Sequence, residues 1–494
     1  MPRVTIRSLI KETAIYGISG VLARSLGLLL LPVLSNLLPL DQFGHYKLTY
    51  VLIGLLQLFF VFGMGNSLVR YLIGAEDEAA VFSSHFWPLF AVTTAGCLAI
   101  FLGADSLASA YFAQALPGDA VMIRLAAVVV WFDSINTLPY SLMRAKNRPL
   151  VYTASILFSA AVYAGLVVYL LGKKDYGMTG VLIANAAGSG AVFLCFVPVL
   201  MRYLRPVFSR ELFGLYFAFG FPIIFSSLGK NLLDLADRWI LDRLLGAATV
   251  AYYSAGYQLA AVANLAVAAF TLAWKPFLVR AAAEKDSDRT FSRIMTLTVA
   301  SLLTLFLAVS FFADDLVGMS FFGYHLIKES YWPGLAVIPP VMISYVFYGI
   351  YVNLTVGCDL SGRTQFYAWT TGVAAAFNIA ANFLLIPHLG MMGSAWATLA
   401  AYVLQAVLLY ILTRRIYPVS YRWGRITLAF GVALAIYAAA GVIDKYASEV
   451  FGSSAEVLIE GGLLAVWCLF LLASRIVRPA RTAGDRSRND GSAA

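Results

Sequence analysis

The feature that most constrains this chain is a series of apolar runs, each about 20 residues long, that recurs from end to end of the sequence. A helical run of this length spans a bilayer, and 61% of the 494 residues are hydrophobic whereas 12% are charged. The runs do not alternate polar and apolar residues, so they predict helices rather than the strands of a membrane barrel. The sequence therefore predicts an all-α integral membrane protein with about 14 transmembrane helices.

Three short motifs occur twice in the same order, at offsets of 207, 215 and 213 residues. The pairs are Leu37–Tyr46 with Leu244–Tyr253, Arg148–Tyr152 with Arg363–Tyr367, and Tyr176–Gly180 with Leu389–Gly393. Spans 1–6 are therefore expected to repeat as spans 7–12. Because six is an even number, the two six-helix lobes would share one orientation and a pseudo-two-fold axis along the membrane normal, with a site between them.

These offsets divide the chain into four predicted parts. They are an N-lobe at 1–205, a C-lobe at 206–415, spans 13 and 14 at 416–480, and a disordered cytoplasmic tail at 481–494. No connecting loop is long enough to hold a soluble domain, so the function is expected to lie within the membrane.

The basic residues are unevenly distributed over the two ends of the predicted helices. Of the 35 Lys and Arg residues, 25 fall on the side of both termini and 8 on the other side. The positive-inside rule then makes both termini cytoplasmic. The net charge of +9 reflects this topology, so we expect no nucleic-acid partner. The four cysteines are widely separated and the histidines are isolated, which predicts no metal site and no catalytic pair.

The stretch Gly220–Arg243 begins as an apolar helix and then carries Lys230, Asp234 and Asp237 on one face. A charge near the middle of a bilayer costs about 2.5–3.5 kcal/mol even on the gentlest scale, so such residues normally face a wet cavity or a partner. We expect this helix to line a cavity for a charged substrate. The alternative is that Lys230 only pairs with Asp234, four residues later.

Arg24 lies in the middle of span 1 and corresponds, by the repeat offset, to Asn231 beside Lys230. Two cations at matching depths in the two lobes would suit a phosphate or pyrophosphate. Asp133 in span 4 has no cation near it in the sequence. Arg24 could instead pair with Asp133, or Asp133 could mark a helix end or bond to a neighbouring Ser or Asn. We place Arg24, Lys230, Asp133 and Asp237 in the predicted substrate site.

Spans 11 and 12 carry two polar pairs with helical spacing, Asn378 with Asn382 and Ser394 with Thr398. Together with Asp234 they provide several oxygen ligands and one negative charge. Such a set would suit Na⁺ or carry a proton. Interhelical hydrogen bonding is the alternative explanation, since it is common for these residue types in membrane bundles.

Two segments resemble a known family. The stretches GVLARSLGLLLLPVLSNLLPLDQFGHYKL and DRWILDRLLGAATVAYYSAGYQL are similar to spans 1–2 and 7–8 of the polysaccharide-type flippases of the multidrug/oligosaccharidyl-lipid/polysaccharide exporter superfamily. The likeness extends over about residues 10–415 and is diffuse. It implies a V-shaped, two-lobed bundle in a bacterial cytoplasmic membrane that works by alternating access.

The resemblance also implies a substrate and an ion. The substrate would be an undecaprenyl-pyrophosphate-linked oligosaccharide, with the pyrophosphate on Arg24 and Lys230, and a polysaccharide polymerase and glycosyltransferases would be partners. Related flippases place sodium between spans 7, 11 and 12, which match Asp234 and the Asn, Ser and Thr pairs. Asn382 stands where an acidic residue is often found, which leaves sodium or proton coupling open.

Three other functions remain open at this point. A lipid-linked peptidoglycan precursor flippase would need further cavity arginines, which are not evident. A cation-coupled multidrug exporter of the same superfamily would need an acidic cavity. A membrane polymerase or acyltransferase would need a large outer loop or a buried catalytic set. We therefore expect a transporter rather than an enzyme.

Overall fold

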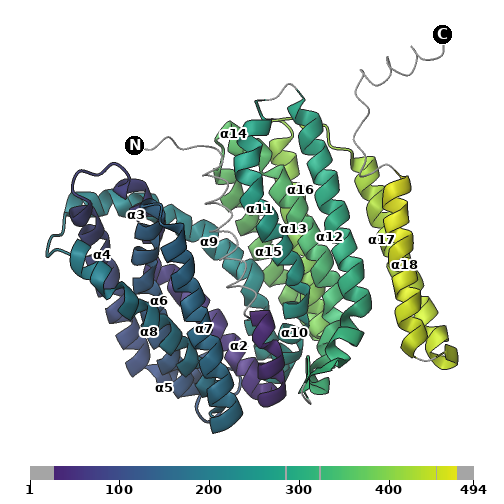
Figure 1. Cartoon of the computed structure of the whole chain (residues 1–494), viewed down its shortest axis with the longest axis horizontal. Coiled ribbons are helices and arrows are strands. Elements are labelled where there is room, and N and C mark those ends of the chain that lie inside the picture. The colour runs from purple at the N-terminus through teal and green to yellow at the C-terminus, as the bar shows by residue number, and fades with distance from the viewer. Residues whose placement is uncertain (1–26, 284–285, 322–323, 452, 475–494) are drawn as a thin grey trace.

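Two helical lobes lie side by side, and a separate helical pair packs against the edge of the second (Figure 1). This computed structural model describes residues 27–283, 286–321, 324–451 and 453–474. We call helices α2–α8 the N-lobe and helices α10–α16 the C-lobe. The two lobes meet at the end where α2 packs on α10.

The N-lobe helices are joined by short turns, and the second predicted span is broken into α2 and α3. In chain order the helices are α2 (Leu40–Val61), α3 (Met64–Leu72), α4 (Glu78–Leu102), α5 (Ala104–Tyr111), α6 (Asp119–Ala145), α7 (Pro149–Lys174) and α8 (Gly177–Tyr203).

The C-lobe follows the long helix α9 and includes one small hairpin of two strands. Its elements are α10 (Ala247–Ala260), α11 (Val262–Ala281), α12 (Ser287–Gly318), β1 (Ser320–Phe321), β2 (Tyr324–His325), η1 (Glu329–Val337), α13 (Ile338–Leu354), α14 (Val356–Ser361), α15 (Gln365–Leu389) and α16 (Met391–Thr413). The outer pair, α17 (Trp423–Phe451) and α18 (Ser453–Ala473), packs on α12, where Trp467 Nε1 donates to Thr304 Oγ1 over 2.9 Å.

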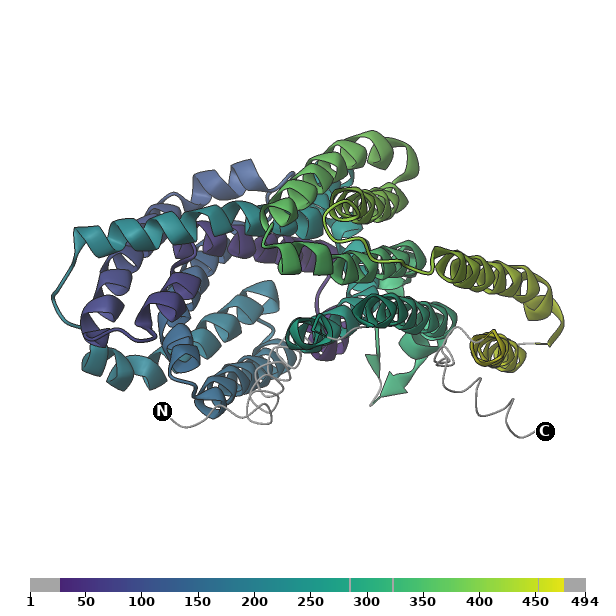
Figure 2. The same ribbon diagram turned by 90° about the horizontal axis from the view of Figure 1, so that it is seen from above.

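Helix α9 (Arg210–Leu245) has 36 residues and so is about 54 Å long at 1.5 Å per residue. Figure 2 shows it running from the N-lobe to the C-lobe. In its first half, the ring of Tyr216 stacks on His85 of α4 at 3.8 Å. In its second half, Asp234 accepts a hydrogen bond from Tyr402 of α16. The predicted first helix of the C-lobe is therefore shared by both lobes.

The break between α2 and α3 lies where α9 crosses the N-lobe. Phe62 and Gly63 at this break both have positive φ, of 31° and 75°. A Cβ atom on Gly63 would lie 2.4 Å from the carbonyl oxygen of Gly220 in α9. Only glycine allows the two backbones to approach so closely in this conformation.

The membrane character predicted from the sequence is confirmed. Among the described residues, ten helices are long and apolar enough to cross a bilayer, or eleven if the bent pair α10 and α11 forms one span. Large apolar side chains remain exposed on the lobes, as on α7, where Val167 and Leu171 are its buried residues, which suits a lipid-facing surface. The count of 14 spans, and the boundaries of the four predicted parts, stay predictions. The predicted tail lies outside the described residues.

Close backbone packing inside the C-lobe gives a test of the fold. A Cβ on Gly256 of α10 would lie 1.9 Å from the carbonyl oxygen of Gly334 in η1. We therefore expect Gly256→Val to lower the free energy of unfolding by about 3 kcal/mol, because backbone atoms cannot yield as a flexible side chain can. Thermal unfolding in detergent measures the effect. Gly165→Val on α7, which meets nothing within 4 Å, is the matched control. Equal melting temperatures for the two variants would contradict this packing.

Candidate functional site

A cavity of about 410 Å³ lies between the two lobes. Helix α2 supplies one wall, and helices α9, α10, α11 and α13 supply the other. Its polar lining includes Lys47, Tyr50, Asp234, Arg238, Gln258 and Tyr345. The cavity therefore has charged groups contributed by both lobes.

Helix α2 presents one face to this cavity. Lys47, Tyr50 and Val51 line it, and Gly54, one turn further, lies against Leu235 of α9. Lys47 Nζ donates a 2.6 Å hydrogen bond to Gln258 Oε1, which joins the two lobes. Within the described part of the chain Lys47 makes no ion pair, so its charge is free for an anion.

Arg238 holds a buried charge on the opposite wall. Its Nη1 donates to Asp237 Oδ1 over 2.9 Å and to the Asp234 carbonyl oxygen over 2.6 Å. Asp237 is fully buried, and its Oδ2 accepts from Tyr253 Oη at 2.6 Å. The guanidinium lies 4.5 Å from the centre of the Tyr257 ring. Charged and aromatic side chains of α9 and α10 are therefore fixed on one side of the cavity.

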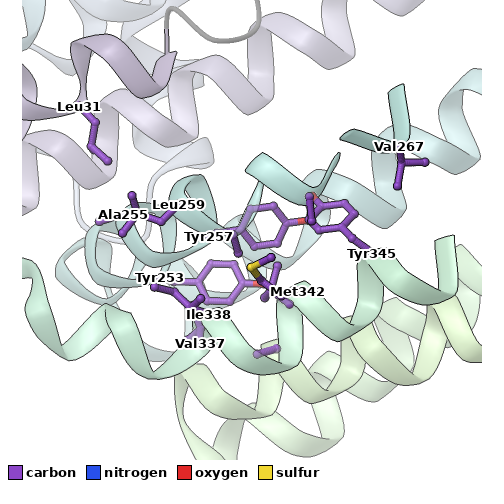
Figure 3. Close-up of a cluster of buried hydrophobic side chains, with 14 of the residues drawn as sticks. Leu31, Tyr253, Ala255, Tyr257, Leu259, Val267, Val337, Ile338, Met342 and Tyr345 are labelled. Atoms are coloured by element: carbon purple, nitrogen blue, oxygen red, sulfur yellow. The ribbon is translucent and has the colours of Figure 1, made fainter. Parts of the chain in front are cut away.

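The rings of Tyr253, Tyr257 and Tyr345 belong to a continuous buried cluster (Figure 3). Tyr345 Oη donates to Tyr257 Oη over 3.0 Å. In Figure 3 these rings lie among aliphatic side chains of α10 and α13, including Ile338 and Met342. Apolar packing thus holds the tyrosines whose rings and hydroxyl groups support Arg238.

Lys230 and Asp234 form the pair that their spacing suggests. Lys230 Nζ lies 3.0 Å from Asp234 Oδ2, and the ammonium also sits 4.4 Å from the centre of the Tyr348 ring. Tyr402 Oη donates to Asp234 Oδ1 at 2.5 Å. The local pairing considered in the sequence is therefore present. With Lys47, Arg238 and Asp237, the region still carries three positive and two negative charges.

Asp133 occupies a separate polar cluster in the N-lobe. Gln57 Nε2 of α2 donates to its Oδ2 over 2.7 Å, and Ser189 Oγ of α8 donates to its Oδ1 over 2.5 Å. The alternatives of a helix end and of bonding to an adjacent Ser or Asn are wrong, since Asp133 lies inside α6 and bonds to two other helices. Arg24 lies outside the described residues, so its position and its pairing stay predictions.

The polar pairs of spans 11 and 12 share one buried interface between α15 and α16. Gln405 Nε2 donates to Thr371 Oγ1 over 2.9 Å and fixes the antiparallel register. Asn378 comes seven residues after Thr371, and Thr398 comes seven residues before Gln405, so in this antiparallel register the two lie opposite each other. In the same way Asn382 and Ser394, each eleven residues from this bond, lie opposite each other.

All four side chains at this interface are fully buried. Asn382 Nδ2 donates to Asn378 Oδ1 over 3.1 Å. Asn382 Oδ1, Ser394 Oγ and Thr398 Oγ1 have no hydrogen-bond partner among the described residues. Buried oxygen atoms without partners are costly, and a bound cation or water would satisfy them. Asn378 Nδ2, a donor, is also without a partner among the described residues, and Asp234 is already engaged by Lys230 and Tyr402.

Two cavity cations, Lys47 and Arg238, were missed as site residues because the sequence places them near predicted helix ends. Both belong to the eight Lys and Arg residues that the charge distribution places on the side opposite the termini. The signal that could have found them is periodicity: Arg238 lies four and eight residues after Asp234 and Lys230 on the same helical face. Asp237, in contrast, points toward α10 and bonds to Tyr253.

Asp237 provides a test of this electrostatic arrangement. We expect Asp237→Asn to lower the free energy of unfolding by about 3–5 kcal/mol, because the Arg238 guanidinium would remain buried without a carboxylate. The control is Asp77→Asn, in an ion pair with Arg205 whose side chains are 55% and 57% exposed, where we expect a loss below about 1 kcal/mol. Chemical unfolding of both variants measures the two free energies of unfolding. Similar losses of free energy in the two variants would contradict the burial of the Arg238 pair.

Comparison with known proteins identifies relatives of the whole arrangement. Residues 9–282, more than half of the chain, match the family model described as polysaccharide biosynthesis protein. An uncharacterised membrane protein of Haemophilus influenzae is 22% identical over 362 residues, covering 69% of this chain and 84% of the relative.

Solved structures with 13% sequence identity share the fold. A lipid II flippase, MurJ in an inward closed conformation, matches 94% of this chain and 99% of its own with a TM-score of 0.74. An inward-facing multidrug resistance transporter of the MATE family and MOP superfamily matches 79% of this chain and 94% of its own with a TM-score of 0.63. These matches confirm the predicted resemblance to the exporter superfamily. The chain belongs to the polysaccharide biosynthesis protein family of membrane proteins.

Proposed function

We propose that this protein moves an undecaprenyl-pyrophosphate-linked oligosaccharide from the cytoplasmic to the outer leaflet of a bacterial cytoplasmic membrane, for surface polysaccharide biosynthesis. The observation that carries this proposal is the cationic cavity between the lobes of a chain from a polysaccharide biosynthesis family. The fold of a lipid II flippase also supports the transport of a lipid-linked saccharide.

The chemistry of the cavity suits a pyrophosphate with an attached sugar. Lys47 of α2 acts as a point charge in the cavity lining, Arg238 of α9 adds a guanidinium beside tyrosine rings, and Lys230 of α9 lies near by, paired with Asp234. Charge attraction is strong here because the surroundings have a low dielectric constant. Amide and hydroxyl groups such as those of Gln258 and Tyr50 can bond to sugar hydroxyls, while the polyprenyl chain would stay in the lipid.

The cavity between the lobes would open alternately to the two faces of the membrane. With both termini cytoplasmic, as the distribution of Lys and Arg suggests, the contact of α2 with α10 lies at the outer end. Hydrogen bonds close this end, among them one that Tyr331 Oη of η1 donates to the Leu38 carbonyl oxygen over 3.1 Å and one that the Ala113 amide donates to Asp242 Oδ2 over 2.8 Å. The molecule would therefore receive its substrate from the cytoplasm.

The other functions fit the site less well. A multidrug exporter for organic cations would be opposed by the two cations, Lys47 and Arg238, that line the cavity with one carboxylate, Asp234. A peptidoglycan precursor flippase remains the second candidate, since its substrate also carries a lipid-linked pyrophosphate. We propose no catalytic role, and a polymerase and glycosyltransferases would act on the glycan before and after this step.

Removing the cavity cations should stop transport. We expect Lys47→Ala and Lys230→Ala each to lower surface polysaccharide by about tenfold or more in a deletion strain of the native host, because each loses a charged contact to pyrophosphate of about 1.5–3 kcal/mol. Arg24→Ala is expected to act in the same way. Quantification of extracted polysaccharide, beside immunoblots of membrane protein, provides the measurement.

Two further variants serve as controls for this experiment. Lys173→Ala, at the exposed end of α7, removes a lysine far from the cavity and should leave the polymer unchanged. Lys47→Arg keeps the positive charge, so this variant should retain most of the surface polysaccharide. Normal polymer from both alanine variants, at native protein levels, would overturn the proposed pyrophosphate site.

We further propose that the α15–α16 interface binds a monovalent cation that drives transport. The three unpartnered oxygen atoms of Asn382, Ser394 and Thr398 support this role, together with the Asn378 carbonyl group. The lack of a carboxylate within this set favours weak, exchangeable binding, as coupling requires. Asp234 could join the set only after leaving Lys230 or Tyr402.

This ion site can be tested by direct binding. We expect ²²Na⁺ to bind to the purified protein and to raise its melting temperature, and we expect the double variant Ser394→Ala/Thr398→Val to lose both effects, because two oxygen ligands are removed. Thr427→Val on the exposed face of α17 is the control and should behave as the parent protein. Undiminished sodium binding in the double variant would contradict the site.

A further inference from the structure

Asp133 stands out because it is a carboxylate far inside a membrane helix. It is the fifteenth residue of α6, about 21 Å from the start of that helix at 1.5 Å per residue. Its two oxygens accept hydrogen bonds from Gln57 and Ser189, which are neutral and belong to α2 and α8. A carboxylate held only by neutral groups at this depth is costly when ionised.

The cluster faces the space between the lobes. Lys47, Tyr50 and Gly54 define the face of α2 that lines the cavity and meets α9, and Gln57 continues this face by one further turn. Asp133, hydrogen-bonded to Gln57, is half-buried rather than sealed.

Both partners of Asp133 can serve either protonation state. A serine hydroxyl can donate or accept, and a glutamine amide can present nitrogen or oxygen after a flip. The ionised carboxylate accepts from both, as observed. A protonated carboxyl could donate to the Ser189 hydroxyl or to Gln57 Oε1.

The C-lobe contains a comparable cluster in which the charge is compensated. By the repeat offset of 213 residues Ser189 corresponds to Tyr402, which binds Asp234. Asp234 is paired with Lys230, so its carboxylate is already stabilised in the ionised form and protonation is not favoured there. Among the described residues no cation forms an ion pair with the N-lobe carboxylate, so it is the one whose charge we expect to change.

The neighbouring helices carry several other charged or titratable groups. These are Lys47 on α2, Arg70 on α3, His85 on α4, Asp105 on α5, Tyr140 and Arg144 on α6, Tyr152 and Tyr163 on α7, Cys195 on α8, and Lys230 and Asp234 on α9. None of the cations in this set forms an ion pair with Asp133. On α6 itself the other charged or titratable groups are Asp119, Arg124, Tyr140 and Arg144, and Tyr140 lies two turns from Asp133.

We propose that Asp133, with Gln57 and Ser189, is a proton-binding site that is separate from the proposed cation site of α15 and α16. Loss of the proton would place an uncompensated negative charge on the cleft face of the N-lobe, opposite Lys230 and Arg238, and would favour approach of the lobes. Proton binding would remove this attraction. The use of this proton in transport rests on the proposed function, whereas its binding does not.

Infrared difference spectroscopy of the full-length purified protein in nanodiscs tests the binding without any glycolipid. We expect a protonated carboxyl C=O band to appear as the pH falls, and we expect Asp133→Asn to lose that band. Asp105→Asn, which removes an exposed carboxyl group at the end of the N-lobe, should retain it and serves as the matched control. The band should also be insensitive to sodium.

Variants of the partners keep the test independent of whether Asp133→Asn folds. Gln57→Leu removes one donor to the ionised carboxylate, so the midpoint of the band should move to higher pH by about one unit or more. Persistence of the band in Asp133→Asn, an unmoved midpoint in Gln57→Leu, or replacement of the band by sodium would each overturn the proposal. Loss of polysaccharide with an intact Asp133 band would instead count against the use of this proton in transport.

Discussion

The cost of burying charge in a low-dielectric interior governs how the two lobes of this protein fit together. Except for Lys47, the charged groups of the cleft have charged or hydroxyl partners on the same helix or on another helix. Asp237 bonds to Arg238 and to Tyr253 of α10, and Asp234 bonds to Lys230 and to Tyr402 of α16. Because Lys47 of α2 bonds to a neutral amide of α10, one positive charge remains uncompensated at the contact between the lobes. That residual charge makes the cleft a place for an anion.

The same requirement explains why polar groups are concentrated where helices are closely packed. The interface of α15 and α16 buries two asparagines, a serine and a threonine, and leaves three of their oxygen atoms without partners. The Asp133 cluster satisfies its carboxylate with neutral donors from α2 and α8. Elsewhere the lobes present apolar side chains to lipid. Buried polar groups are thus concentrated in the cleft and in these two clusters, with further buried pairs such as His45 with Asp119.

Contacts that depend on helical periodicity could be predicted from the sequence, whereas contacts between distant helices could not. Four-residue spacing predicted the pair of Lys230 with Asp234, and the apolar runs predicted the all-helical membrane fold. The partners of Asp133 are 76 and 56 residues away, and their identity depends on how α2, α6 and α8 pack. Lys47 and Arg238 were taken for loop charges because apolar composition does not fix helix ends. The sequence placed α9 in the C-lobe alone, because its 36-residue length and its contacts with both lobes do not follow from the apolar runs.

Helix α9 links the electrostatics of the cleft to movement of the lobes. Its first half packs on the N-lobe through Tyr216, and its second half carries Lys230, Asp234 and Arg238 toward the C-lobe. Gly220, in the first half of α9, meets Gly63 at a break in the N-lobe where two successive residues have positive φ. Small residues and a helix break concentrate backbone change at one point. If the lobes separate, α9 must pivot near Gly220 or bend, and either motion shifts the three charges relative to Lys47 and Asp133. Charge in the cleft and the angle between the lobes are therefore coupled by a single helix.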